Sequence, residues 1–206
     1  MIITLSRQYG AGGSRVAEGV ANALGWRLID NELVDQVAAR LGLTPEEVAE
    51  REERAPGFLD RLIRMLVSAA PEILKAPSDT MPDLEEAKQV KVTEAVVEDL
   101  ARAGKVVMVG RAASAVLSSD RDALHVKIVA PKPQRIAETM RRLDLNPKDA
   151  EAEVTRSDDN RKRYHRQHYG RDWNDAVHYH MVLNTGPLGI DGATSAIVGR
   201  ARAMWP

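Results

Sequence analysis

Glycines cluster near the start of the chain, in the segment SRQYGAGGS at residues 6–14. The segment follows a short apolar run at 2–5, which is predicted to be a buried strand, and precedes a stretch of helical periodicity at 15–24. A glycine-rich turn between a strand and a helix can point several backbone N–H groups at a phosphate, and the helix N-terminus adds partial positive charge. The chemistry that these residues predict is therefore phosphate binding.

The segment matches the standard P-loop pattern G-x-x-x-x-G-K-[ST] only in part. Gly12 and Ser14 match, but Arg7 stands at the first glycine. Gly13 stands where the pattern has a lysine. Because that lysine normally reaches the β- and γ-phosphates, another cation must replace it if the chain transfers phosphate. Arg7, Arg15 and the arginines near residue 160 are the candidates, and a glycine-rich turn without a ligand is the alternative interpretation.

Other candidate residues lie where predicted strands end. Arg111 follows Gly110 directly after the apolar strand predicted at 105–109, and Asp30 ends a short strand predicted at 27–29. Ligands in open α/β sheets bind outside the carboxyl ends of the strands. Arg111 is therefore predicted to bind an anionic substrate, with a surface residue at a helix start as the alternative. Asp30 is predicted to hold a magnesium-bound water or a substrate hydroxyl, or else to cap the following helix.

Strand and helix patterns alternate along the chain. Further strands are predicted at 124–129 and 179–183, and helices at 32–41, 84–103, 132–143 and 192–204. This alternation predicts an α/β fold with a mainly parallel sheet that is covered on both faces. The length of 206 residues predicts a single domain, residues 1–206.

Two segments interrupt the alternation. Residues 44–85 are rich in proline and open with a helix-start pattern, which predicts a helical insertion or, functionally, a lid over the substrate. The region 144–175 is predicted to be a lid region rich in arginine. Its Arg156, Arg161 and Arg163 are spaced so that a hinged helix can swing them toward transition-state charge. A solvated basic helix is the alternative.

The aromatic and histidine residues of this region have simpler interpretations. Trp173 and Tyr169 are predicted to pack or to act at the lid hinge rather than to stack on a base. His165 and His168 share one helix face, but no third ligand accompanies them, so a zinc site is not favoured.

Composition excludes several functional classes. The formal net charge of −1 gives no electrostatic basis for binding nucleic acid or an anionic membrane. The chain has no cysteine, which excludes disulfides and thiolate chemistry, and we expect a cytoplasmic location. No apolar run is long enough to span a membrane. An amphipathic stretch with Leu62, Met65 and Leu66 is either part of the core or the interface of a homodimer.

Several strings of the chain, taken in order, resemble the cytidylate kinase-like proteins, a branch of the P-loop nucleoside monophosphate kinases. They are SRQYGAGG at 6–13, LIDNEL at 28–33, VMVGRA at 107–112, the segment 158–169 and YHMVLNT at 179–185. The resemblance implies a P-loop NTPase-type three-layer α/β/α fold with a five-stranded sheet, an insertion that holds a monophosphate and a mobile arginine-rich lid. It also implies transfer of the γ-phosphoryl group of ATP to CMP or dCMP, with Mg²⁺.

The resemblance further implies roles for the candidate residues. It assigns the ATP phosphates to Arg7, Gly10, Ala11, Gly12, Gly13, Ser14 and Arg15, magnesium to the Ser14 hydroxyl, the substrate to Asp30, Gly110 and Arg111, and catalytic charge to Arg111, Arg156, Arg161 and Arg163. Typical members have Asp after the Gly-Arg pair, where this chain has Ala112, so recognition of cytosine or ribose does not follow. A nucleotide-binding protein without kinase activity and a kinase of another small molecule are the alternatives.

Overall fold

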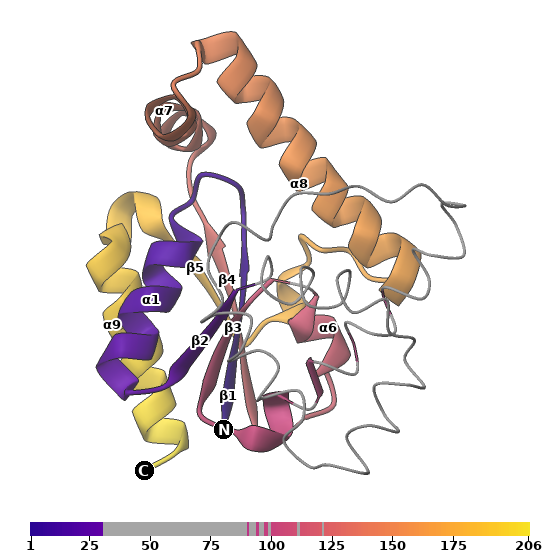
Figure 1. Cartoon of the computed structure of the whole chain (residues 1–206), viewed down its shortest axis with the longest axis vertical. Helices are drawn as coiled ribbons and strands as arrows, with labels where there is room; N and C mark the ends of the chain where they lie inside the picture. The colour runs from indigo at the N-terminus through magenta and orange to yellow at the C-terminus, as the bar shows by residue number, and fades with distance from the viewer. Residues whose placement is uncertain (31–89, 91–93, 95–96, 99, 111, 121) are drawn as a thin grey trace, which may run out of the picture. The chain divides into compact units, whose positions relative to one another are not determined.

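A computed structural model of the chain describes residues 1–30, 90, 94, 97–98, 100–110, 112–120 and 122–206 (Figure 1). The chain divides into two compact units, one formed by Met1–Leu28 with Lys105–Pro206 and the other by Ile29–Gly104. The predicted insertion at 44–85, with Leu62, Met65 and Leu66, lies outside the described residues, as does the predicted helix at 32–41. Residues 90, 94, 97–98 and 100–103 are helical, in agreement with the helix predicted at 84–103.

The described strands form one five-stranded sheet in the order β2-β3-β1-β4-β5. They are β1 (Ile2–Arg7), β2 (Arg27–Asp30), β3 (Val106–Val109), β4 (Ala123–Val129) and β5 (Met181–Asn184). β1 pairs in parallel with both β3 and β4, and β4 pairs in parallel with β5. The predicted α/β fold with a parallel sheet is therefore confirmed. Because β1 is the central strand, the glycine-rich segment that follows it lies at the carboxyl edge of the sheet, in the middle of the strand order.

The helices of the described residues follow the strands in turn. They are α1 (Gly13–Leu24), α6 (Ala113–Val116), α7 (Lys132–Leu143), α8 (Pro147–Tyr169) and α9 (Thr185–Met204), with a short 3₁₀ helix, η2 (Ala176–His178). α7 has the predicted bounds, and most of the predicted lid region is one helix, α8, capped at its start by the side chain of Asn146. In the part of the chain that the structure describes, no helix has the length and apolar character needed to cross a membrane.

Two predicted elements near the C-terminus were wrong in their bounds. The strand predicted at 179–183 begins only at Met181, because Asp175 caps η2 through the N–H of Val177 and the chain leaves that turn at Tyr179. The helix predicted at 192–204 begins earlier, at Thr185. Its first turn contains glycine and proline, which suggested a loop, but Asn184 caps the helix and a kink at Gly189 absorbs the irregularity.

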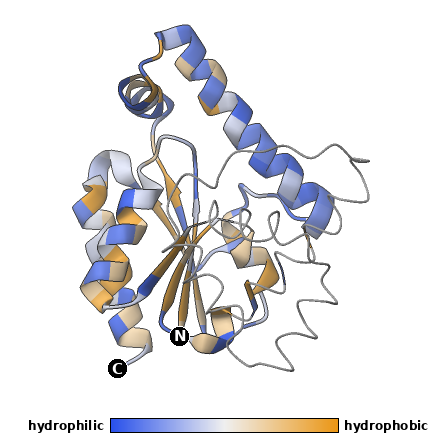
Figure 2. Ribbon diagram, in the orientation of Figure 1, coloured by the Kyte–Doolittle hydropathy of each residue, from blue (hydrophilic) through white to orange (hydrophobic). Residues whose placement is uncertain are grey.

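The two faces of the sheet differ in character. Ile3 and Leu5 of β1 point to the same side as Val126 of β4, and with α1 and α9 they form the apolar core. The alternate residues point to the other face, where α6 lies, and several of them are buried and polar: Thr4, Ser6, His125 and Lys127. Figure 2 shows a different contrast, between the mostly apolar strands of the sheet and the mostly hydrophilic residues of α8. Buried polar side chains therefore gather on one face of the sheet.

Candidate phosphate-binding site

The turn between β1 and α1 has the backbone geometry of an anion-binding loop. Gly10 has φ 76°, and Gly12, the residue that caps α1, has φ 76° and ψ 14°. Both values lie in the left-handed region that favours glycine. The first-turn amides of a helix have no acceptor within the helix, so the N–H groups of Gly13, Ser14 and Arg15 can donate to a bound anion. The first turn of α1 contains no acidic residue that would repel an anion.

Close packing explains where two of the glycines stand. A Cβ atom at Gly10 would lie 2.6 Å from the carbonyl oxygen of Arg135, so only glycine allows the loop to approach α7 this closely. A Cβ atom at Gly13 would lie 2.5 Å from the Cβ of Arg7. Any side chain at this position, lysine included, therefore requires Arg7 to move. The stem of Arg7 occupies the space next to the position where the standard pattern has its lysine.

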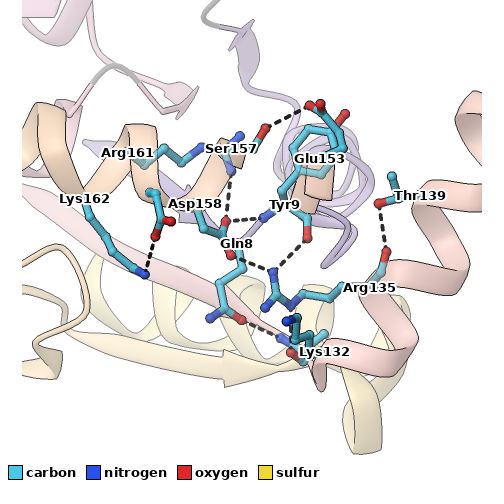
Figure 3. A network of polar contacts seen from close by, with 12 residues as sticks. Gln8, Tyr9, Lys132, Arg135, Thr139, Glu153, Ser157, Asp158, Arg161 and Lys162 are labelled. Atoms are coloured by element: carbon cyan, nitrogen blue, oxygen red, sulfur yellow. Dashed lines mark hydrogen bonds and ion pairs between the residues drawn. The ribbon is translucent and has the colours of Figure 1, made fainter. Parts of the chain in front are cut away.

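Residues of α7 and α8 bind both backbone polar groups of Tyr9, its N–H and its carbonyl (Figure 3). The N–H of Tyr9 donates to Oδ1 of Asp158 at 2.9 Å, and its carbonyl accepts from Nη1 of Arg135 at 3.2 Å. Arg135 and Asp158 also form an ion pair of 2.6 Å, and both side chains are only 9% exposed. Gln8 adds a second attachment, because its side-chain oxygen accepts from the N–H of Ala130 at 3.2 Å. The loop is thus tied to the β4–α7 junction and to the middle of α8.

Of the predicted lid arginines, the structure brings Arg161 to the loop. Its Nη1 lies 3.3 Å from Oδ1 of Asp158, and its guanidinium carbon lies 5.6 Å from the centre of the Tyr9 ring. Arg156 and Arg163 are exposed on α8, where they contact Glu153 and Asn160 of the same helix. Their catalytic assignment stays a prediction.

The other predicted site residues are placed as follows. Gly110 directly follows β3, has φ 82° and donates its N–H to the carbonyl of Leu5 at 3.0 Å, so it lies beside β1 at the carboxyl edge of the sheet. Ser14 is exposed on the first turn of α1. Arg111 and the side chain of Asp30 lie outside the described residues.

A second polar cluster lies beneath the loop, on the face of the sheet opposite α1. Trp173, which is 1% exposed, donates its indole N–H to Oγ of Ser6 at 2.8 Å. Lys127 donates to the Trp173 carbonyl and, at 3.1 Å, to Oδ1 of Asn174. Burial lowers the pKa of Lys127 to about 8. Trp173 therefore packs at the end of α8 as predicted for a hinge or packing residue, and it joins α8 to the strand that enters the loop.

A pocket of about 400 Å³ opens on the same face, beside β4. It is lined by Ser118, His125, Arg171, Val177, His178, Tyr179 and His180. The ring of His125 is already bound on both sides, to the Thr4 hydroxyl at 2.7 Å and to the Leu117 carbonyl at 3.1 Å. Burial, together with the charges of His180 and Arg171, lowers the pKa of His125 to about 4. No group of three His, Cys, Asp or Glu side chains that could hold a metal ion occurs among the described residues.

Sequence reasoning missed Arg135, Asp158 and Lys127. A signal for Asp158 was present, because it continues the buried stripe of α8 that begins with Ala150 and Val154 at helical spacing. Lys127 alternates with apolar residues of β4 and so shares a face with His125, but charge alone suggested solvent exposure. Arg135 carried no signal in the sequence.

The five-stranded parallel sheet in the order 2-3-1-4-5 gives this chain an α/β fold like that of the P-loop kinases. The chain belongs to the cytidylate kinase-like family, whose model matches residues 2–187. It is 25% identical over 205 residues to a cytidylate kinase of Methanothrix thermoacetophila, with 99% of each chain covered.

Two solved structures share the fold. An uncharacterized protein from Eubacterium ventriosum has a TM-score of 0.72 at 21% identity, with 98% of this chain and 99% of that chain covered. A shikimate kinase from Bacteroides thetaiotaomicron has a TM-score of 0.53 at 11% identity, with 98% of each chain covered. At these identities the likeness concerns the fold alone.

Proposed function

We propose that the protein is a nucleoside monophosphate kinase-like phosphotransferase, which transfers the γ-phosphoryl group of ATP to CMP or dCMP. The observation that carries the proposal is the glycine turn at the start of α1, at the carboxyl end of the central strand β1. Membership of the cytidylate kinase-like family supports it. In the reaction, an oxygen of the acceptor phosphate bonds to the γ-phosphorus while the bond to the bridging oxygen of ADP breaks.

Phosphoryl transfer asks the protein mainly for positioning and for positive charge around the transferred group. In the proposed mechanism, the amides of Gly13, Ser14 and Arg15 bind the phosphates of ATP, and Arg161 on α8 supplies charge next to the loop. Arg111, directly after β3, binds the acceptor phosphate. Asp30 is assigned to a substrate hydroxyl or a magnesium-bound water.

Magnesium fits the same loop. Ser14 is an exposed residue in the first turn of α1 and stands at the serine or threonine position of the P-loop pattern, whose hydroxyl would hold the ion. Oxygen ligands from one side chain together with substrate phosphates are typical of Mg²⁺ sites in kinases. The ion neutralises charge on the β- and γ-phosphates when it is bound.

A coupled assay of ADP release tests the proposal. ATP and Mg²⁺ are combined with a panel of nucleoside monophosphates that includes CMP and dCMP, and Arg111→Ala serves as the control. We expect turnover with a pyrimidine monophosphate that the control lacks. Absence of turnover above Arg111→Ala for every acceptor would exclude this function.

A nucleotide-binding protein without kinase activity is the second candidate. The packing of Gly13 against Arg7 favours it, because the loop has no room for the usual lysine in this arrangement. Isothermal titration with ATP that shows binding, together with the absence of turnover, would support this candidate. Absence of any nucleotide affinity would exclude both.

A further inference from the structure

Tyr9 lies in the loop between β1 and α1, directly before Gly10, and other parts of the chain bind both its N–H and its carbonyl. Asp158 accepts its N–H at 2.9 Å, and Arg135 donates to its carbonyl at 3.2 Å. Two cations approach the ring of Tyr9: the guanidinium carbon of Arg142 lies 4.7 Å from the ring centre, and that of Arg161 lies 5.6 Å from it. Side chains of α7 and α8 therefore orient the two peptide groups on either side of the Tyr9 Cα atom.

Asp158 is a buried carboxylate whose oxygens are well supplied with donors. Oδ2 accepts from Arg135 at 2.6 Å, and Oδ1 accepts from the Tyr9 amide and, at 3.3 Å, from Arg161. Hydrogen bonds to an ionised group are roughly twice as strong as neutral ones, and a buried charge requires such partners. The guanidinium of Arg135 is fixed in turn by the carbonyls of Ala130, at 3.1 Å, and Tyr9. Asp158 thus completes a rigid frame behind the loop.

We propose that Asp158 is a positioning residue that forms the phosphate loop before a nucleotide arrives. The proposal rests on the proposed function in that the loop is the nucleotide site. A loop with glycines at positions 10, 12 and 13 is flexible by itself, and ordering it on binding weakens affinity. The loop lacks the lysine that normally binds phosphate. The fixed shape of the loop therefore contributes a larger share of the affinity of the protein for nucleotide.

The same donors suggest an opposite role, in which the Asp158 carboxylate occupies the place of a phosphate and must leave on binding. Backbone amides and arginines are the groups that bind phosphate. The two roles predict opposite effects when the charge of Asp158 is removed. If Asp158 holds the loop in shape, removing its charge weakens ATP binding. If Asp158 competes with the phosphate, removing its charge strengthens ATP binding.

Asp159 provides a matched control on the same helix. Its side chain is 58% exposed and pairs with Lys162 at 2.8 Å on the surface, so Asp159→Asn makes the same chemical change away from the loop. The experiment compares Asp158→Asn with Asp159→Asn and the unmodified chain. ATP affinity is measured by isothermal titration, and hydrogen exchange of the amides at 8–14 is measured without nucleotide.

We expect Asp158→Asn to raise the dissociation constant for ATP by about 10-fold, the effect of one lost charge-assisted contact. Exchange of the loop amides becomes faster in the free protein, while Asp159→Asn behaves as the unmodified chain does. A purely structural role would lower the melting temperature but leave loop exchange and ATP affinity at their original values. Asp158→Ala, which removes the acceptor as well, is expected to show a larger change of the same sign.

Unchanged affinity with unchanged loop exchange overturns the proposal, and so does tighter binding of ATP by Asp158→Asn. If the unmodified chain binds no nucleotide, the proposed function fails, but loop exchange in the free protein still decides whether Asp158 holds the loop. If Asp158→Ala does not fold, Asp158→Asn, which has nearly the same size, carries the test.

Discussion

The indole nitrogen of Trp173 donates a hydrogen bond of 2.8 Å to the hydroxyl oxygen of Ser6, across 167 positions of sequence. Ser6 is the second-last residue of β1, just before the glycine-rich turn, and Trp173 follows the last turn of α8. Lys127 helps to hold Trp173 in place. Its ammonium group donates to the Trp173 carbonyl, and its Nζ lies 3.9 Å from the centre of the indole ring. The segment after α8 and the end of β1 are therefore packed against each other.

A double-mutant cycle measures this link. Trp173→Phe and Ser6→Ala each remove one partner of a buried hydrogen bond, and each is expected to lower the free energy of unfolding by at least about 1 kcal/mol. Because both remove the same interaction, the double variant is expected to lose about 0.5–1.5 kcal/mol less than the sum of the single variants. Urea denaturation provides the free energies. Additive losses would show that the hydrogen bond contributes nothing to stability.

Lys127 predicts a dependence of stability on alkaline pH. Its pKa is about 8 in the folded chain, against 10.5 for an unperturbed lysine, so the unfolded chain binds more protons between these values. The free energy of unfolding should therefore rise with pH between about 8 and 10.5, by roughly 1–3 kcal/mol, relative to Lys127→Met. Denaturation of both proteins over this pH range tests the prediction. Parallel pH profiles for the two proteins would contradict it.

His125 predicts the loss of stability in acid. Burial is the largest cause of its lowered pKa of about 4, against 6.5 for an unperturbed histidine. The unfolded chain binds the proton first as the pH falls, so the stability that the neutral ring contributes is complete above 6.5 and is lost by about 4. The unmodified chain should lose up to about 3 kcal/mol more than His125→Gln across this window. An equal loss in both proteins would assign acid sensitivity to other groups.

Gly10→Ala tests the approach of the loop to α7, with Gly25→Ala as its control. Both glycines have positive φ, 76° and 65°, but a Cβ atom meets the Arg135 carbonyl oxygen at Gly10 and nothing within 4 Å at Gly25. The left-handed conformation costs about 1–2 kcal/mol in each variant. The contact at Gly10 should add at least about 1 kcal/mol, since the obstacle is backbone. Equal losses of unfolding free energy in the two variants would show that α7 moves away from the new Cβ atom at no measurable cost.

Much of the fold was predictable because the strands are short apolar runs that need burial on both faces. The runs at 2–5 and 105–109 became the central strand β1 and its neighbour β3, with small differences at their ends. The strand predicted at 179–183 was placed two residues too early, since the chain leaves the capped 3₁₀ turn Ala176–His178 at Tyr179 and enters the sheet only at Met181. The start of this strand therefore depends on the capped turn before it, which the periodicity of residue types does not reveal.

The candidate site was predictable where backbone conformation depends on residue type. Glycine adopts positive φ readily, so the glycines at positions 10 and 12 predicted a tight turn before the helix, and both have positive φ in the structure. The partners of Tyr9 were not predictable, because Asp158 and Arg135 are 149 and 126 positions away from it. A charge in a sequence gives no information on whether it is buried.

The sequence by itself determined the alternating α/β order and the position of the glycine turn between β1 and α1. These properties follow from local preferences, namely apolar period and the conformational freedom of glycine. Only the tertiary structure decided that Asp158 and Arg135 bind the N–H and the carbonyl of Tyr9, and that Arg7 fills the space beside Gly13. Such contacts join residues far apart in the chain, so they exist only once the sheet and helices have packed.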